Sequence, residues 1–102
     1  SDKMGDGDPE LGEILIKGFV YALTQLETPP AVILFYNGGA RLTAKDSPCI
    51  EDLRTLQEQG TEILTCGTCV NFYDLGEPVV GTVTNMYTIA EKLTNASKVI
   101  RP

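Results

Sequence analysis

The chain has 102 residues, of which 42% are hydrophobic and 22% charged, a balance typical of a folded globular protein rather than a disordered one. Its formal net charge of −6 disfavours nucleic acid and anionic membranes as partners, because both carry negative charge. The absence of histidine excludes a histidine-activated nucleophile and a zinc site with histidine ligands, and three cysteines cannot supply four thiolates.

The first predicted element is a helix over residues 8–27, which follows a glycine-rich stretch. Asp8 is a suitable N-cap and Pro9 fits the first helical position, while the sequence ETPP ends the helix. Apolar residues at helical spacing predict one broad buried face, which consists of Leu11, Ile14, Leu15, Phe19, Ala22, Leu23 and Leu26.

An apolar strand is predicted next, over residues 31–37 (AVILFYN). A strand without polar alternation is usually covered on both faces, which favours a parallel sheet with helices on either side. Residues 38–47 are predicted to form a loop. The segment Asn37-Gly38-Gly39 lacks the full pattern of a phosphate-binding loop, so we interpret it as a turn, in which Asn37 and Gly38 are candidate substrate contacts.

Ser47 and Pro48 predict the start of a second helix, whose inner stripe is Ile50, Leu53 and Leu56. Cys49 lies in the first turn of this helix, and core packing is its predicted role. Gly60 is placed where a helix ends in a left-handed residue. A second strand, TEILTC, follows over residues 61–66.

The remaining elements are shorter. Residues 70–75 predict a short helix and residues 76–85 a loop or brief extended piece. Thr84 or Asn85 is expected to cap a last helix, and residues 97–102 (SKVIRP) are predicted to form a final strand. The inner stripe of the last helix is expected to be Met86, Ile89, Ala90 and Leu93.

The order of these elements predicts an open α/β fold. Such folds normally begin with a strand, whereas this chain begins with a helix. We therefore expect a first strand upstream of Ser1 or frayed at residues 1–3, so that the chain looks like an excised domain.

The segment CGTC places two thiols three residues apart, directly after a predicted strand. In open α/β sheets ligands bind at the carboxyl ends of the strands, and helix starts stabilise thiolates. Cys66 and Cys69 are therefore the candidate catalytic residues, with Gly67 and Thr68 as substrate contacts in the turn between them. Further support for a thiolate is expected only from Arg41, Lys45 and the hydroxyls of Thr65 and Thr68.

Four segments resemble the DsrE/DsrF-like family, and within it the selenium-metabolism YedF type: GDGDPELGEILIKGF, ILFYNGGARLT, ILTCGTCVNFY and VGTVTNMYTIAEKL. The resemblance spans nearly the whole chain, and LTCGTC and VTNMYTI are its most specific parts. It implies one DsrE-like domain over residues 1–102, with a flavodoxin-like three-layer α/β/α sandwich around a parallel sheet. It also implies assembly as homotrimers or hexamers.

The resemblance further implies roles for the two thiols. Better-understood members of the family relay sulfur as a persulfide on a cysteine that follows a strand, which corresponds to Cys66. Cys69 is the additional thiol of the YedF type. Proteins of this type usually carry an N-terminal TusA-like domain with a Cys-Pro motif, which this chain lacks.

The leading hypothesis is a cytoplasmic sulfur- or selenium-relay protein that needs no resident metal or cofactor. Cys66 would accept the sulfur or selenium from a donor protein, and Cys69 would resolve the persulfide or protect it as a disulfide. One alternative is a thiol-disulfide oxidoreductase, since a strand followed by CxxC and a helix is also the thioredoxin-like layout. The others are a non-catalytic oligomeric binding module and a metal bridged between subunits. The apolar segment with Phe72, Tyr73, Val79 and Val80 is predicted to meet another subunit.

Overall fold

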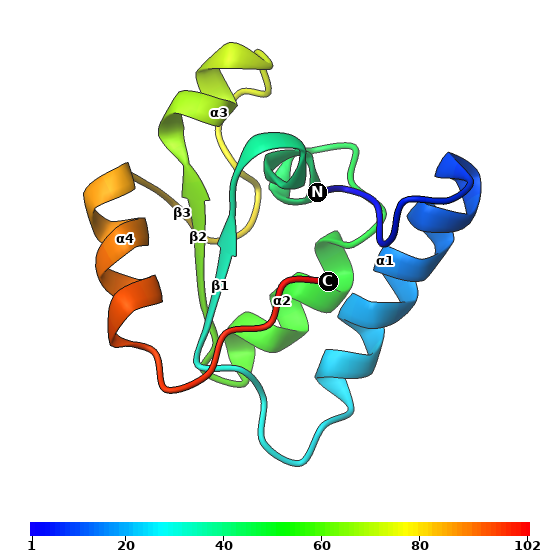
Figure 1. Ribbon diagram of the computed structural model, residues 1–102, viewed down its shortest axis with the longest axis horizontal. Coiled ribbons are helices and arrows are strands. Elements are labelled where there is room, and N and C mark those ends of the chain that lie inside the picture. The colour runs from blue at the N-terminus through cyan, green and yellow to red at the C-terminus, as the bar shows by residue number, and fades with distance from the viewer.

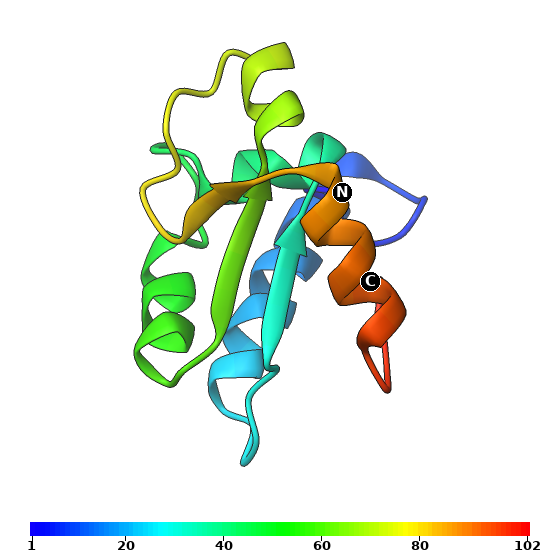
Figure 2. The same cartoon turned by 90° about the vertical axis from the view of Figure 1, so that its left-hand side faces the viewer.

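The computed structural model describes residues 1–102 and has helices on both faces of a parallel three-stranded sheet (Figure 1). The strands are β1 (Val32–Phe35), β2 (Glu62–Cys66) and β3 (Thr82–Thr84), in the spatial order β1-β2-β3. The helices are α1 (Pro9–Thr24), α2 (Ile50–Glu58), α3 (Gly67–Phe72) and α4 (Met86–Asn95), together with a 3-10 helix η1 (Asn37–Thr43). Figure 2 shows α1 and α2 on one side of the sheet and α4 on the other. The predicted α/β class with a parallel sheet is confirmed.

The strand register brings the carboxyl ends of β1 and β2 to the same edge of the sheet. Phe35 of β1 pairs with Thr65 of β2, and Cys66 at the end of β2 pairs with Thr84 of β3. The chain leaves β1 through η1 and leaves β2 through α3, so both connections lie at this edge (Figure 1). Residues far apart in sequence therefore meet here.

The hydrophobic core lies between the sheet and the pair α1 and α2. Cys49, Leu53 and Leu56 are completely buried, as the sequence predicts for the second helix and for Cys49. This core cluster consists of Ile16, Val20, Phe35, Leu42, Cys49, Leu53, Leu56, Ile63 and Val80.

The predicted inner face of α1 is wrong, although its N-cap is confirmed by hydrogen bonds from the backbone N–H groups of Glu10 and Leu11 to the Asp8 carboxylate (2.9 and 3.2 Å). The buried residues of α1 are Gly12, Ile16, Val20 and Thr24. Most of the predicted face is exposed instead, including Leu11, Ile14, Leu15, Ala22 and Leu26, whereas Phe19 and Leu23 are partly buried.

Gly12 explains which side of α1 turns inward. A Cβ at this position would lie 3.0 Å from the Cβ of Lys3, and the Met4 backbone N–H donates to the Gly12 carbonyl (3.0 Å). Residues 3 and 4 can pack this closely on α1 because Gly12 has no side chain. Since both sides of α1 carry apolar residues, their spacing alone did not identify the inner side.

The structure corrects three further predictions from the sequence. Residues 37–43 form η1 rather than a loop, and residues 97–102 form no strand, because nothing pairs with their backbone. Instead this tail crosses the front of the sheet in Figure 1, and Val99 and Ile100 are exposed. Residues 1–3 are not a frayed strand either, and Asp2 forms an ion pair with Arg41 (3.6 Å).

Helix α4 covers its face of the sheet only thinly. Of its predicted stripe Ile89 is buried, whereas Met86, Ala90 and Leu93 are exposed. The Asn85 side chain caps the helix by accepting from the Thr88 N–H (2.9 Å), as predicted. No helix of the structure has both the length and the apolar character needed to traverse a bilayer.

Candidate functional site

Cys66 ends strand β2 and serves as the N-cap of the six-residue helix α3. Strand alternation places its side chain on the same face as Leu64, away from the main core, and only 2% of Cys66 is exposed. The next residue is Gly67, where a Cβ would lie 2.9 Å from Cγ1 of Val83. Glycine therefore lets the turn between the cysteines pack directly against β3.

The surroundings of Cys66 lower the pKa of its thiol. Burial raises the pKa of this thiol, but hydrogen bonds from the backbone and side chains of Cys69 and Thr68 outweigh burial and lower the pKa below its ordinary value. A thiol with a lowered pKa is more often in its reactive, charged form at neutral pH.

Cys69 lies one turn further along, half-buried, and it is held by the β1–η1 connection. The backbone N–H of Asn37 donates to the Cys69 sulfur at 3.0 Å. Asn37 has a left-handed backbone (φ 51°), and its side-chain oxygen accepts from the Tyr73 hydroxyl at 2.7 Å. The Arg41 guanidinium stacks over the Tyr73 ring, 4.2 Å from its centroid. These contacts fix Cys69 between α3 and η1.

The pKa of Cys69 moves in the opposite direction. Burial raises it first, and the hydrogen bond with Cys66 and the charge of Cys66 raise it further, while the Asn37 N–H lowers it only in part. The opposite shifts make Cys66 the more acidic thiol of the pair.

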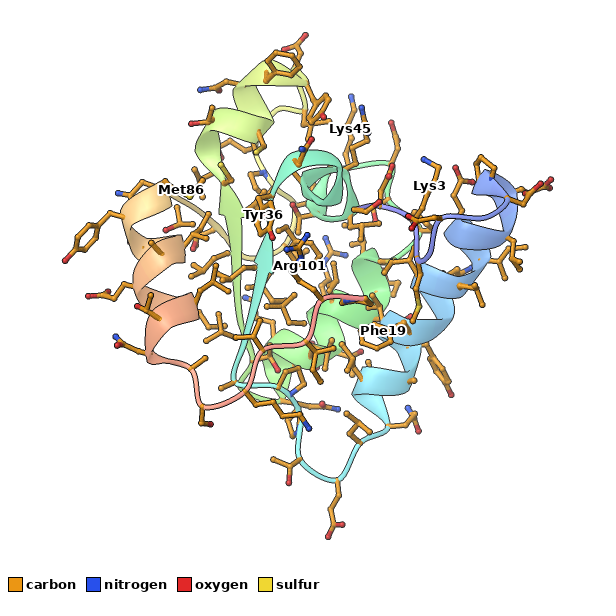
Figure 3. The ribbon with its side chains drawn as sticks, viewed as in Figure 1. Lys3, Phe19, Tyr36, Lys45, Met86 and Arg101 are labelled. Atoms are coloured by element: carbon orange, nitrogen blue, oxygen red, sulfur yellow. The ribbon has the colours of Figure 1, made fainter.

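A pocket of about 310 Å³ opens beside Cys69. Figure 3 labels two of its residues, Tyr36 after the end of β1 and Met86 at the start of α4. Its lining is mainly apolar and contains no charged side chain: Tyr36, Asn37, Thr68, Cys69, Phe72, Tyr73 and Met86. Cys66 does not line it.

The structure brings most of the predicted site residues together. Cys69, Thr68 and Asn37 line the pocket, Cys66 lies behind Cys69, and Gly67 packs on β3. Gly38 instead faces Asp2 and is outside the pocket lining.

Of the predicted supporting groups, only Thr68 interacts with a thiol. The Thr65 hydroxyl pairs with Thr43 at 2.8 Å, and Arg41 interacts with Tyr73 and Asp2 instead. Nothing places Lys45 near either cysteine.

The sequence did not identify the aromatic part of the pocket. Tyr36 and Met86 were missed, and Phe72 and Tyr73 were interpreted only as a subunit contact. The available signal was their position: Tyr36 directly follows a predicted strand, and Phe72 and Tyr73 lie one turn beyond CGTC. Val80 was one of the four residues predicted to meet another subunit, but it is buried in the core, whereas Phe72 is 83% exposed.

No three side chains of histidine, cysteine, aspartate or glutamate converge where they could hold a metal ion. The fold and the site define an α/β protein with two hydrogen-bonded free thiols at the carboxyl edge of its sheet. No family model matches the chain, and neither the curated proteins nor the solved structures contain a match.

Proposed function

We propose that this protein is a thiol-based carrier of sulfur or selenium, held as a persulfide or selenosulfide in the CxxC segment. One observation carries the proposal: Cys66, a buried thiol whose pKa is lowered, lies next to a second thiol, Cys69, which lines a pocket. Persulfide transfer needs an attacking thiolate and access for the donor sulfur, and the pair of thiols provides both.

The uncharged pocket suits a cysteine presented by another protein. A donor loop with an apolar flank could lie against Phe72 and Met86, which are 83% and 61% exposed. Donor and acceptor proteins of a sulfur or selenium relay, including a TusA-like domain, are therefore the proposed partners. We propose in addition that the protein belongs to the DsrE-like family, lies in the cytoplasm and assembles as homotrimers or hexamers.

The experiment is mass spectrometry of the reduced protein after incubation with a cysteine desulfurase and cysteine. We expect one added sulfur within the peptide that contains Cys66 and Cys69. If a control acceptor is loaded and neither cysteine gains sulfur, the carrier function is excluded.

A thiol-disulfide oxidoreductase is the second candidate, because the two thiols are within hydrogen-bonding reach and could close a disulfide. Insulin reduction distinguishes the two functions. Activity close to that of thioredoxin, without sulfur loading, would support the oxidoreductase.

A further inference from the structure

We propose that Cys69, rather than Cys66, takes the incoming sulfur atom, and that Cys66 then attacks Cys69 and releases the sulfur as sulfide when no acceptor protein takes it. This division of roles rests on the proposed function and reverses the one expected from the sequence. It follows from the position of the two sulfurs relative to the pocket.

Access separates the two thiols. A donor persulfide is attacked in line with the bond that breaks, so the attacking sulfur needs an open approach. Cys66 is only 2% exposed and is absent from the pocket lining. Cys69 is half-buried and forms part of the pocket wall. Only the Cys69 sulfur can therefore meet a sulfur atom that enters through the pocket.

The contacts around Cys69 suit it to hold the transferred sulfur as a persulfide. The Asn37 N–H points at the Cys69 sulfur from 3.0 Å, and the Tyr73 hydroxyl fixes Asn37 through a 2.7 Å hydrogen bond. A backbone N–H stabilises negative charge on a sulfur atom. The outer sulfur of a persulfide on Cys69 would extend into the pocket.

The first step transfers sulfur without net oxidation. The Cys69 sulfur attacks the outer sulfur of the donor persulfide as its proton passes to the Cys66 thiolate. A bond forms between Cys69 and the outer sulfur, the donor sulfur–sulfur bond breaks, and its electron pair leaves on the donor thiolate.

The second step releases the sulfur. Cys66 attacks the inner sulfur, that of Cys69, so that a Cys66–Cys69 disulfide forms and the outer sulfur leaves as hydrosulfide with the proton from Cys66. Over the two steps together, both cysteine sulfurs are oxidised by one electron each, and the donor persulfide is reduced by two electrons to its thiolate and hydrosulfide. A dithiol reductant then regenerates the free thiols.

The test compares the wild-type chain with Cys66→Ser and Cys69→Ser, using a cysteine desulfurase and cysteine as the persulfide source. Peptide mass spectrometry locates the added sulfur, and a colorimetric assay measures sulfide. Desulfurase alone provides the sulfide background. Cys49→Ala is the matched control, since Cys49 is a thiol buried in the core. Circular dichroism confirms that each variant is folded.

We expect Cys66→Ser to load sulfur more slowly, because it lacks the thiolate that takes the Cys69 proton. Once loaded, it should keep the persulfide on Cys69 and release sulfide at least about tenfold more slowly than wild type, because the second attack is missing. Cys69→Ser should gain no sulfur, and Cys49→Ala should behave as wild type. The wild-type chain should gain sulfur on Cys69 first and, with no acceptor protein present, convert afterwards to the Cys66–Cys69 disulfide.

Two results would overturn the inference in different ways. If Cys69→Ser loads sulfur on Cys66 at the wild-type rate, the roles are reversed but the carrier function stands. If none of the folded chains gains sulfur while a control acceptor does, the carrier function itself fails.

Discussion

The two faces of the sheet are built differently. On the face covered by α1 and α2, Cys49, Leu53 and Leu56 are completely buried within a nine-residue cluster. On the face covered by α4, Ile89 and Leu64 are buried, but Met86 and Leu93 of α4 remain exposed. The first face holds most of the buried apolar volume, and the second is thin.

The thick layer stabilises the fold, whereas the thin layer carries the candidate reactive thiols. Cys49 lies in the thick layer, belongs to the same core cluster as Leu53, Leu56 and Ile63, and is completely buried. Cys66 belongs to the thin layer, beside the pocket opening at Cys69. The same residue type thus serves as a core residue in one place and as a candidate reactive group in the other. The following measurements test the contrast.

The largest effect is expected in the thick layer. Leu53→Ala should lower the free energy of unfolding by about 3–5 kcal/mol, because the filled surroundings leave a cavity, whereas Ile89→Ala should cost about 2 kcal/mol, since the thin layer can relax. Urea denaturation of both variants measures the difference. Equal losses would show that the two faces are packed alike.

Two glycines provide a matched test of the approach between β2 and the segment that precedes β3. Gly76 and Gly81 both have left-handed backbones (φ 72° and 73°), but only Gly81 has a close neighbour, with Cγ2 of Ile63 at 2.6 Å from an added Cβ. Gly76→Ala should cost about 1 kcal/mol from backbone strain, and Gly81→Ala about 2 kcal/mol more from overpacking. Similar losses in thermal or urea unfolding would contradict the close approach.

The buried Cys49 predicts a loss of stability at alkaline pH. Burial first, and then the Asp52 charge, raise the pKa of Cys49, so the folded state keeps its proton while the unfolded chain releases it. Stability from this group is complete below the unfolded pKa and is lost as the pH rises, by up to about 1.4 kcal/mol per pH unit. Between about pH 9 and 10.5, the free energy of unfolding should decrease less steeply with pH for Cys49→Ala than for wild type. An equal decrease in both proteins would contradict this.

The smallest effect is expected at the surface of the thin layer. Lys92 of α4 pairs with Glu62 of β2 at 3.0 Å, and both side chains are substantially exposed. Lys92→Ala should reduce stability by only about 0.2–1 kcal/mol, and less in high salt, because water screens exposed ion pairs. A loss of stability that exceeds this range and does not depend on salt would show that the pair is not an ordinary exposed ion pair.

The sequence predicted the local elements well, because their causes are local. Asp8 and Asn85 both cap helices through short-range hydrogen bonds, and Leu53 and Leu56 turn inward on a helix with a single apolar side. The apolar strands and their parallel pairing also followed from composition and order. The helix caps and the buried side of α2 depend on residues within one or two turns of each other.

Features set by distant contacts were not predictable in this way. Helix α1 has apolar residues on two sides, and its inward side depends on how residues 3 and 4 pack against Gly12. The tail at residues 97–102 has apolar residues suited to a strand, yet no neighbouring strand accepts it. Local propensity gave the wrong result in both places because tertiary packing decides them.

The site was predictable only in part for the same reason. The spacing of Cys66 and Cys69 and the strand before them placed both thiols at the sheet edge. Their unequal exposure, and the contact of Cys69 with Asn37, which is 32 positions away in sequence, depend on the route of η1 across this edge. No pattern within either segment indicates that contact.

The left-handed backbone at Asn37 limits what any redesign of the pocket could place there. Glycine would accept the φ of 51° but would leave the Tyr73 hydroxyl without its acceptor. Aspartate would keep an acceptor but would set a second negative charge beside the sulfurs, and β-branched residues would strain the chain. A library randomised at position 37 and selected for sulfur transfer should therefore return asparagine, so pocket engineering is better directed at Phe72 and Met86.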